Sequence, residues 1–208
     1  FNSIIIDFPN YTTQIGEQIK AILRRSGLSR EERYALFALN RLECVDEIKS
    51  QVERIYKETK NPIRLIFDRF SSSNLLTLAY DLSNNALKET SLEEIEHELR
   101  GSTIIDLTTQ LKLMKELDTS FHELLRIELE NLVIFVPQID PEISLSRVSK
   151  DSSREGSDKY ETAKIQRIAY HLYKLAAQLD IFNIYLEDQV INNVEQTQDQ
   201  LATVMRNI

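Results

Sequence analysis

Apolar residues recur at helical spacing along most of this chain. The first such stripe consists of Ile15, Ile19, Ile22 and Leu23. It predicts an amphipathic helix that begins near residue 13 and ends before Gly27. Ser29 and Glu32 then form a capping-box pattern, and helical spacing continues without Gly or Pro as far as Asn61-Pro62. We therefore expect one helix over 30–60.

The helical pattern continues through the middle of the chain. Residues 63–70 (IRLIFDRF) predict a two-turn helix, and apolar stripes predict further helices over 75–90, 91–101 and 104–117. Residues 121–136 are in helical phase at their start, which favours a helix. Their LVIFV run could equally be a buried strand, because periodicity cannot separate the two for a short apolar run.

The two ends of this body have a different pattern. Residues 1–10 (FNSIIIDFPN) are short, rich in isoleucine and closed by Pro9, which favours an extended N-terminal arm or an edge strand. Residues 137–160 carry two prolines, many serines and many charges, which is typical of a flexible linker or a long exposed loop. We therefore divide the chain into an arm (1–10), a helical body (11–136), the linker and a C-terminal helix (161–208).

The C-terminal segment has a regular apolar seam. Its spacing alternates between three and four residues from Ile165 to Leu186 and resumes after a shift of four residues, which predicts one long helix with a coiled-coil-like edge. A seam this thin cannot stabilise an isolated long helix, so a partner helix is expected. The expected partner-binding residues are Leu172, Leu175, Leu179, Phe182, Leu186, Val190, Val194 and Leu201.

Composition and charge exclude some classes to which this protein could belong. Only 4 Gly and 4 Pro are present, too few for the many turns of a sandwich or barrel. The formal net charge is −8, which argues against non-specific nucleic-acid binding because that binding needs an excess of Lys and Arg. One local basic cluster could still contact phosphate, although pairing with acidic residues is the preferred interpretation. It comprises Arg24, Arg25, Arg30 and Arg33.

Cysteine usage and hydropathy bear on the compartment. The lone Cys44 lies in a helical pattern, where packing is its expected role, and no disulfide framework exists. No run of 18 apolar residues and no secretory signal pattern is present, so we expect an intracellular, cytoplasmic protein without a transmembrane segment. The chain begins at Phe1, which is consistent with a fragment of a longer protein.

A search for catalytic and metal-binding motifs gives no match. The chain contains no G-x-x-x-x-G-K-[ST], G-x-G-x-x-G, G-x-S-x-G or H-E-x-x-H pattern. Glu94 and His97 form a single E-x-x-H, whereas a di-iron bundle needs two together with further glutamates. We therefore expect no catalytic residue, no metal and no cofactor.

These patterns predict an all-α protein: an antiparallel bundle of about six helices with a long, coiled-coil-like C-terminal helix. The function they favour is that of a non-enzymatic adaptor, scaffold or complex subunit whose C-terminal helix binds a helical partner or a second copy of the chain. The alternative is a regulatory, nucleic-acid-associated helical module that uses the basic N-terminal cluster. An enzyme of unrecognised type is a third hypothesis.

Overall fold

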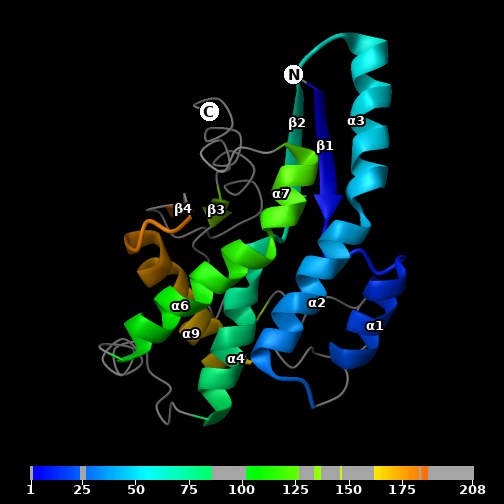
Figure 1. Ribbon diagram of the computed structural model, residues 1–208. Coiled ribbons are helices and arrows are strands. Elements are labelled where there is room, and N and C mark those ends of the chain that lie inside the picture. Colours follow the sequence, from blue (N-terminus) through cyan, green and yellow to red (C-terminus); the bar gives the residue numbers. More distant parts are fainter. Residues whose placement is uncertain are drawn as a thin grey trace. The chain divides into compact units, whose positions relative to one another are not determined.

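The chain forms two compact units, each of which contains a pair of parallel strands (Figure 1). The computed structural model describes residues 2–23, 27–85, 102–126, 134–136, 146, 162–182 and 184–186. The first unit comprises residues 1–74 and 112–131, and the second comprises 75–111 and 132–208. The all-α prediction is therefore wrong, because strands that pair in parallel and are connected through helices make this an α/β chain.

In the first unit, β1 (Asn2–Asp7) and β2 (Ile63–Asp68) lie side by side and run in the same direction (Figure 1). The prediction of an extended segment at the N-terminus is confirmed. The prediction of a two-turn helix over 63–70 is wrong, because residues 63–68 form the strand β2. Every residue from Ile63 to Phe67 is half-buried, so the strand shows no alternation of buried and exposed positions, and its sequence resembles that of a short buried helix.

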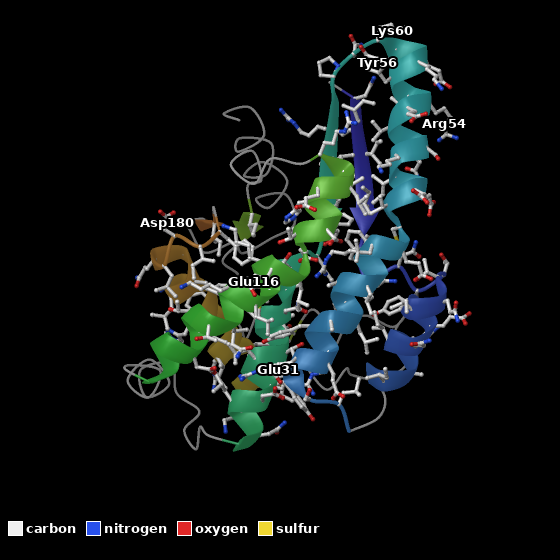
Figure 2. The ribbon with its side chains drawn as sticks, viewed as in Figure 1. Glu31, Arg54, Tyr56, Lys60, Glu116 and Asp180 are labelled. Atoms are coloured by element: carbon white, nitrogen blue, oxygen red, sulfur yellow. The ribbon has the colours of Figure 1, made fainter. Side chains whose placement is uncertain are left out.

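Three helices connect these two strands: α1 (Gln14–Leu23), α2 (Arg30–Glu43) and α3 (Val45–Thr59). The single helix expected over 30–60 is thus two helices, with Cys44 serving as the C-cap of one and the N-cap of the next. The helix α3 ends at Lys60, whose backbone is left-handed with φ 55°. Lys60 Nζ lies 5.7 Å from the centre of the Tyr56 ring, and Figure 2 shows both at this end of α3.

The capping box predicted at the start of α2 is confirmed. Ser29 Oγ accepts a hydrogen bond from the Glu32 N–H at 3.2 Å, and Glu32 Oε2 accepts one from the Ser29 N–H at 2.7 Å. Each bond satisfies a backbone donor that the first turn of a helix cannot pair internally.

We expect Ser29→Ala to lower the free energy of unfolding by about 1 kcal/mol, because the Glu32 N–H loses its acceptor. Urea unfolding monitored by circular dichroism measures the change. Ser29→Asp is the control, since a carboxylate at the N-cap can accept the same hydrogen bond. Equal losses in the two variants would mean that the cap does not act through this bond.

The first unit is completed by η1 (Ser71–Asn74), the end of α6 (Ser102–Leu117) and α7 (Thr119–Leu125). The helix α7 contacts both α2 and α3. The buried apolar core of the first unit includes Ile4, Phe8, Ile19, Tyr34, Ala38, Val45, Ile48, Phe70, Met114 and Phe121. Residues after each strand and on each helix contribute to this core, so the strand ends are attached to the body of the unit.

In the second unit, α4 (Leu75–Asn85) packs against α9 (Ala163–Gln178). Lys164 Nζ donates a hydrogen bond to the Ser83 carbonyl oxygen at 3.0 Å across this contact. The strands β3 (Ile134–Val136) and β4 (Ile184–Leu186) pair in parallel, and α9 lies between them in the chain. The strand alternative for the LVIFV run is therefore correct for residues 134–136, and the preferred helix is wrong there.

The prediction of one continuous helix over 161–208 is also wrong. The helix α9 ends at the C-cap Leu179, and Asp180 follows with a left-handed φ of 50°. A left-handed residue directly after the cap is a common way to end a helix. The chain then enters β4, so the coiled-coil-like rod does not form across residues 179–186. The expected linker 137–160 lies outside the described residues except at Ser146.

Candidate functional site

The carboxyl ends of β1 and β2 lie side by side. Asp7 and Asp68, the last residues of the two strands, are register partners. The Phe8 N–H, one residue further on, donates a hydrogen bond to the Asp68 carbonyl oxygen at 2.9 Å. In α/β folds, ligands bind outside the carboxyl ends of parallel strands, because the loops that leave the sheet there can surround them. This edge is therefore the first place to look for a site.

Three exposed charged side chains lie at this edge: Asp7 at the end of β1, Asp68 at the end of β2, and Arg69 directly after β2. Across the described ranges, none of the three forms an ion pair. Arg69 has a left-handed backbone with φ 62°, a conformation that residues other than glycine seldom adopt. Such conformations concentrate at ligand-binding positions, where the surrounding structure holds them in place. An available guanidinium beside two available carboxylates is therefore the main chemical feature of this edge.

Beneath these residues lies a buried ion pair. Arg41 on α2 donates two hydrogen bonds to the Asp118 carboxylate, from Nε to Oδ1 at 2.7 Å and from Nη2 to Oδ2 at 2.9 Å. The Ser71 hydroxyl, at the start of η1, donates a third hydrogen bond to Asp118 Oδ2. Arg41 is 3% exposed and Asp118 is fully buried, so this carboxylate links α2, η1 and the start of α7 away from solvent.

Aromatic rings surround this ion pair. Phe8, Phe67, Phe70 and Phe121 contact one another with ring centres 5.1–6.0 Å apart. The Arg41 guanidinium lies 5.5 Å from the centre of the Phe70 ring, within the range of a cation–π contact. Phe8 after β1 and Phe70 after β2 thus pack on the same two rings, those of Phe67 and Phe121.

A polar network holds the loop after β1. The buried Asn40 side chain accepts a hydrogen bond from the Asn10 N–H at 2.8 Å and donates to the Asn10 carbonyl oxygen at 3.1 Å. Glu43 accepts hydrogen bonds from the N–H groups of Gln14 and Ile15 at 3.0 and 3.1 Å. A carboxylate from α2 therefore caps the N-terminus of α1, and both contacts fix the loop relative to α2.

Cys44 belongs to the same region, and its surroundings favour the packing role predicted for it. The thiol is buried and its Sγ accepts a hydrogen bond from Asn10 Nδ2 at 3.7 Å. Burial raises the pKa of this thiol above its ordinary value, an effect that the Asn10 hydrogen bond only partly opposes. A thiol with a raised pKa is a poor nucleophile at neutral pH.

His122 lies one helical turn after Asp118 and is 4% exposed. Its ring packs on Phe70 and Phe121, and neither ring nitrogen has a hydrogen-bond partner in the described part of the chain. Burial lowers the pKa of His122 below its ordinary value of 6.5, and the nearby Asp118 carboxylate offsets part of this effect. The imidazole is consequently neutral in the folded protein at neutral pH.

We expect this histidine to make the folded state less stable in acid. Below about pH 6.5 the unfolded chain protonates His122 while the folded chain does not, so the free energy of unfolding falls until the pH reaches the lower, folded-state pKa. Urea unfolding at pH 7.5 and 5.5 measures the fall, and His122→Leu should reduce it. The same fall in both proteins would show that other groups cause it.

The structure describes two of the four arginines of the predicted basic cluster. Arg24 and Arg25 lie outside the described residues. Arg30 pairs with Glu31 at 3.4 Å, and the buried Arg33 donates from Nη1 to the Leu28 carbonyl oxygen at 2.8 Å. The Arg30 contact is with the adjacent acidic residue and the Arg33 contact is with a backbone oxygen, so the preferred interpretation, pairing of the cluster with acidic residues, stays a prediction. Phosphate contact by this cluster stays a prediction.

The predicted partner-binding residues fall into three groups. Leu172 and Phe182 are buried, and Leu175 and Leu179 are half-buried. Leu186 is the last residue of β4, and the positions beyond it lie outside the described residues: Val190, Val194 and Leu201. A helical partner or self-association through these residues stays a prediction.

Sequence reasoning missed Asp68 and Arg69. The available signal was a charged pair that directly follows an apolar run, but it has meaning only when that run is identified as a parallel strand. Within the described ranges, no group of three His, Cys, Asp or Glu side chains is placed to hold a metal ion. Within the same ranges, no helix is both long enough and apolar enough to cross a bilayer.

Comparisons with known proteins give a fold and a relative. No family model matches the sequence. The chain is 34% identical over 132 residues to the protein named "Putative thymidylate kinase 251L" of Invertebrate iridescent virus 6, a match that covers 62% of this chain. The chain spans 57% of the length of that relative. The structure of this chain is similar to that of thymidylate kinase from Candida albicans, with a TM-score of 0.57 and 20% sequence identity. The match covers 99% of this chain and 80% of the fungal one.

These likenesses overturn the functional interpretation of the sequence. The structural match shows that the chain has the α/β fold of the fungal kinase, not that of a helical scaffold. Both similar proteins are named as kinases, which contradicts the expectations of a non-enzymatic adaptor, scaffold or subunit and of a coiled-coil protein without enzymatic activity.

Proposed function

We propose that this chain is a nucleotide kinase chain that binds a nucleoside monophosphate, with thymidylate as the first candidate, at the carboxyl edge of β1 and β2. The observation that carries the proposal is the available guanidinium of Arg69 beside the Asp68 carboxylate at the ligand-binding edge of a parallel sheet. The likeness of sequence and fold to two thymidylate kinases supports the same choice.

Arg69 suits the phosphate of such a ligand. A guanidinium is planar and always charged, and its N–H groups can donate two parallel hydrogen bonds to phosphate oxygens. In phosphoryl transfer to a monophosphate, an oxygen of the acceptor phosphate bonds to the γ-phosphorus of ATP while the bond to ADP breaks. Because both reactants are anionic, a cation that holds the acceptor phosphate both positions it and offsets repulsion.

Asp68 suits a different part of the reactants. A carboxylate can accept a hydrogen bond from a sugar hydroxyl, and it can bind the Mg²⁺ that enters with ATP directly or through water. The single positive charge of Arg69 offsets part of the negative charge of Asp68 and of its register partner Asp7 when the monophosphate is absent. The pair therefore offers one group for the phosphate and one for a hydroxyl or cation.

Thymidylate is proposed as a substrate from the names of the two similar proteins. The Candida albicans kinase has a broad substrate specificity, so several monophosphates belong in the test. Place of action is part of the same proposal: a kinase that consumes ATP acts inside cells, and the buried, free thiol of Cys44 is compatible with that environment.

The proposal is tested by measuring ADP release from Mg²⁺-ATP with and without dTMP, dUMP and dGMP, together with calorimetric binding of each monophosphate. We expect saturable dTMP binding, and ADP release that depends on dTMP and takes place without a G-x-x-x-x-G-K-[ST] loop, which the sequence lacks. Binding without turnover would support the monophosphate site and remove the catalytic part of the proposal. The absence of both turnover and binding for every monophosphate would contradict it.

A further inference from the structure

The backbone of Arg69 adopts a left-handed conformation that must be held in place if the side chain is to bind a ligand. Its φ of 62° is sparsely populated for a residue with a Cβ atom. The side chain is exposed, so packing of the guanidinium does not fix it. The constraint must therefore come from the residues on either side.

Both neighbours of Arg69 are fixed by hydrogen bonds. The Asp68 carbonyl oxygen accepts the Phe8 N–H at 2.9 Å. On the other side, the Phe70 N–H donates to Ser73 Oγ at 3.2 Å, and the Phe70 carbonyl oxygen accepts the Ser73 N–H at 2.8 Å. Arg69 is thus the one residue between the end of β2 and a closed turn that leads into η1.

The Asp118 carboxylate holds that turn in place. It accepts the Ser71 hydroxyl, and it holds Arg41, whose guanidinium lies 5.5 Å from the centre of the Phe70 ring. The buried Asp118 carboxylate therefore contacts Ser71 directly. It also binds Arg41, whose guanidinium packs on Phe70. Its own position at the N-cap of α7 is fixed by the His122 N–H, which donates to its carbonyl oxygen at 3.0 Å.

We infer that Asp118 is a positioning residue, which fixes the turn at Phe70 and Ser71 and thereby presents the Arg69 guanidinium to the phosphate of the bound nucleotide. The inference rests on the proposed function for the identity of the ligand. It does not require Asp118 to touch that ligand, and the carboxylate is fully buried. Its charge is already engaged by Arg41 and Ser71, so it acts through geometry.

The experiment uses Ser71→Ala, which removes the tether to the turn and leaves the Arg41–Asp118 ion pair in place. The matched control is Ser50→Ala on the exposed face of α3. Calorimetry compares dTMP with thymidine, the same nucleoside without the phosphate. We expect Ser71→Ala to weaken dTMP binding by on the order of 10-fold, and by no more than Arg69→Ala does, with thymidine binding unchanged, because a misplaced group loses its contact while the rest of the site is intact.

A double-mutant cycle with Arg69→Ala tests whether Ser71 acts through Arg69. In the Arg69→Ala background, Ser71→Ala should have no further effect on dTMP binding. An additive loss, or an equal loss for thymidine and dTMP in the single variant, would overturn the positioning role and indicate a general loosening of the fold.

A second measurement does not depend on the ligand. Amide hydrogen exchange at Phe70 and Ser73, whose N–H groups close the turn, should be faster in Ser71→Ala than in Ser50→Ala. If the unchanged chain binds no monophosphate, the proposed function fails, and faster exchange still supports the anchoring of the turn. Unchanged exchange would overturn the inference whatever the chain binds.

Discussion

Replacement of Gly16 by alanine is expected to lower the free energy of unfolding by about 3 kcal/mol or more, near the upper end of overpacking effects. An added Cβ at this position would lie 1.8 Å from the Asn10 carbonyl oxygen and 2.8 Å from Tyr11 Cα. Both obstacles are backbone atoms, and the Asn40 side chain holds Asn10 in place, so neither can rotate away. The loop after β1 would have to move away from α1 to make room for the added methyl group.

Gln18→Ala is the control for this prediction. Gln18 is exposed on the same helix, and its replacement should change the stability by no more than about 0.5 kcal/mol. Urea unfolding of the two variants and the unchanged chain gives the comparison. Equal stability of Gly16→Ala and Gln18→Ala would mean that the close approach of the loop to α1 does not exist in solution.

Replacement of Asp118 by asparagine is expected to lower the free energy of unfolding by about 3–5 kcal/mol. The change leaves the Arg41 guanidinium charged and 3% exposed without its counter-ion, and an uncompensated buried charge is among the most destabilising changes to a core. The Ser71 hydroxyl keeps an acceptor in the new amide oxygen, so most of the loss should come from the ion pair.

The double replacement Arg41→Met with Asp118→Leu identifies the origin of that loss. Removal of both charges leaves no unpaired buried charge at this position, so the double variant should be more stable than Asp118→Asn alone. Thermal and urea unfolding provide the measurement for all three proteins. If the double variant is the less stable of the two, packing around the pair matters more than its charge.

Local signals in the sequence were sufficient for part of the fold. The helix over 14–23, the capping box at Ser29 and the extended segment before Pro9 each depend on neighbouring residues, and the structure confirms all three. Sequence reasoning made no use of Gly16, although a glycine within a helix is unfavourable unless another part of the chain passes close to it, as Asn10 does here.

Two of the errors have the same physical cause. A parallel strand pairs with a distant segment, and when its side chains on both faces are partly buried its sequence lacks the alternation that marks a sheet with one exposed face. This is why 63–70 and 134–136 resembled helices. The seam across residues 179–186 misled for a different reason, since apolar residues at helical spacing do not show that Asp180 adopts a left-handed backbone.

The candidate site depended on those missed strands. Nothing in the local sequence distinguishes Asp68 and Arg69 from the other charged pairs of the chain. They become a candidate site only when β2 places them at a carboxyl edge beside β1. The partners Arg41 and Asp118 are separated by 77 positions in the chain, so no spacing rule could have paired them.

The central claim is that Arg69 holds the phosphate of a nucleoside monophosphate. The most direct test is the dissociation constant of dTMP for the unchanged chain, for Arg69→Ala and for Arg54→Ala, which removes an exposed arginine on α3 (Figure 2). We predict that Arg69→Ala weakens dTMP binding by about 10-fold or more, the loss of one charge-assisted contact, and that Arg54→Ala leaves it unchanged. Equal affinity in all three proteins would contradict the claim.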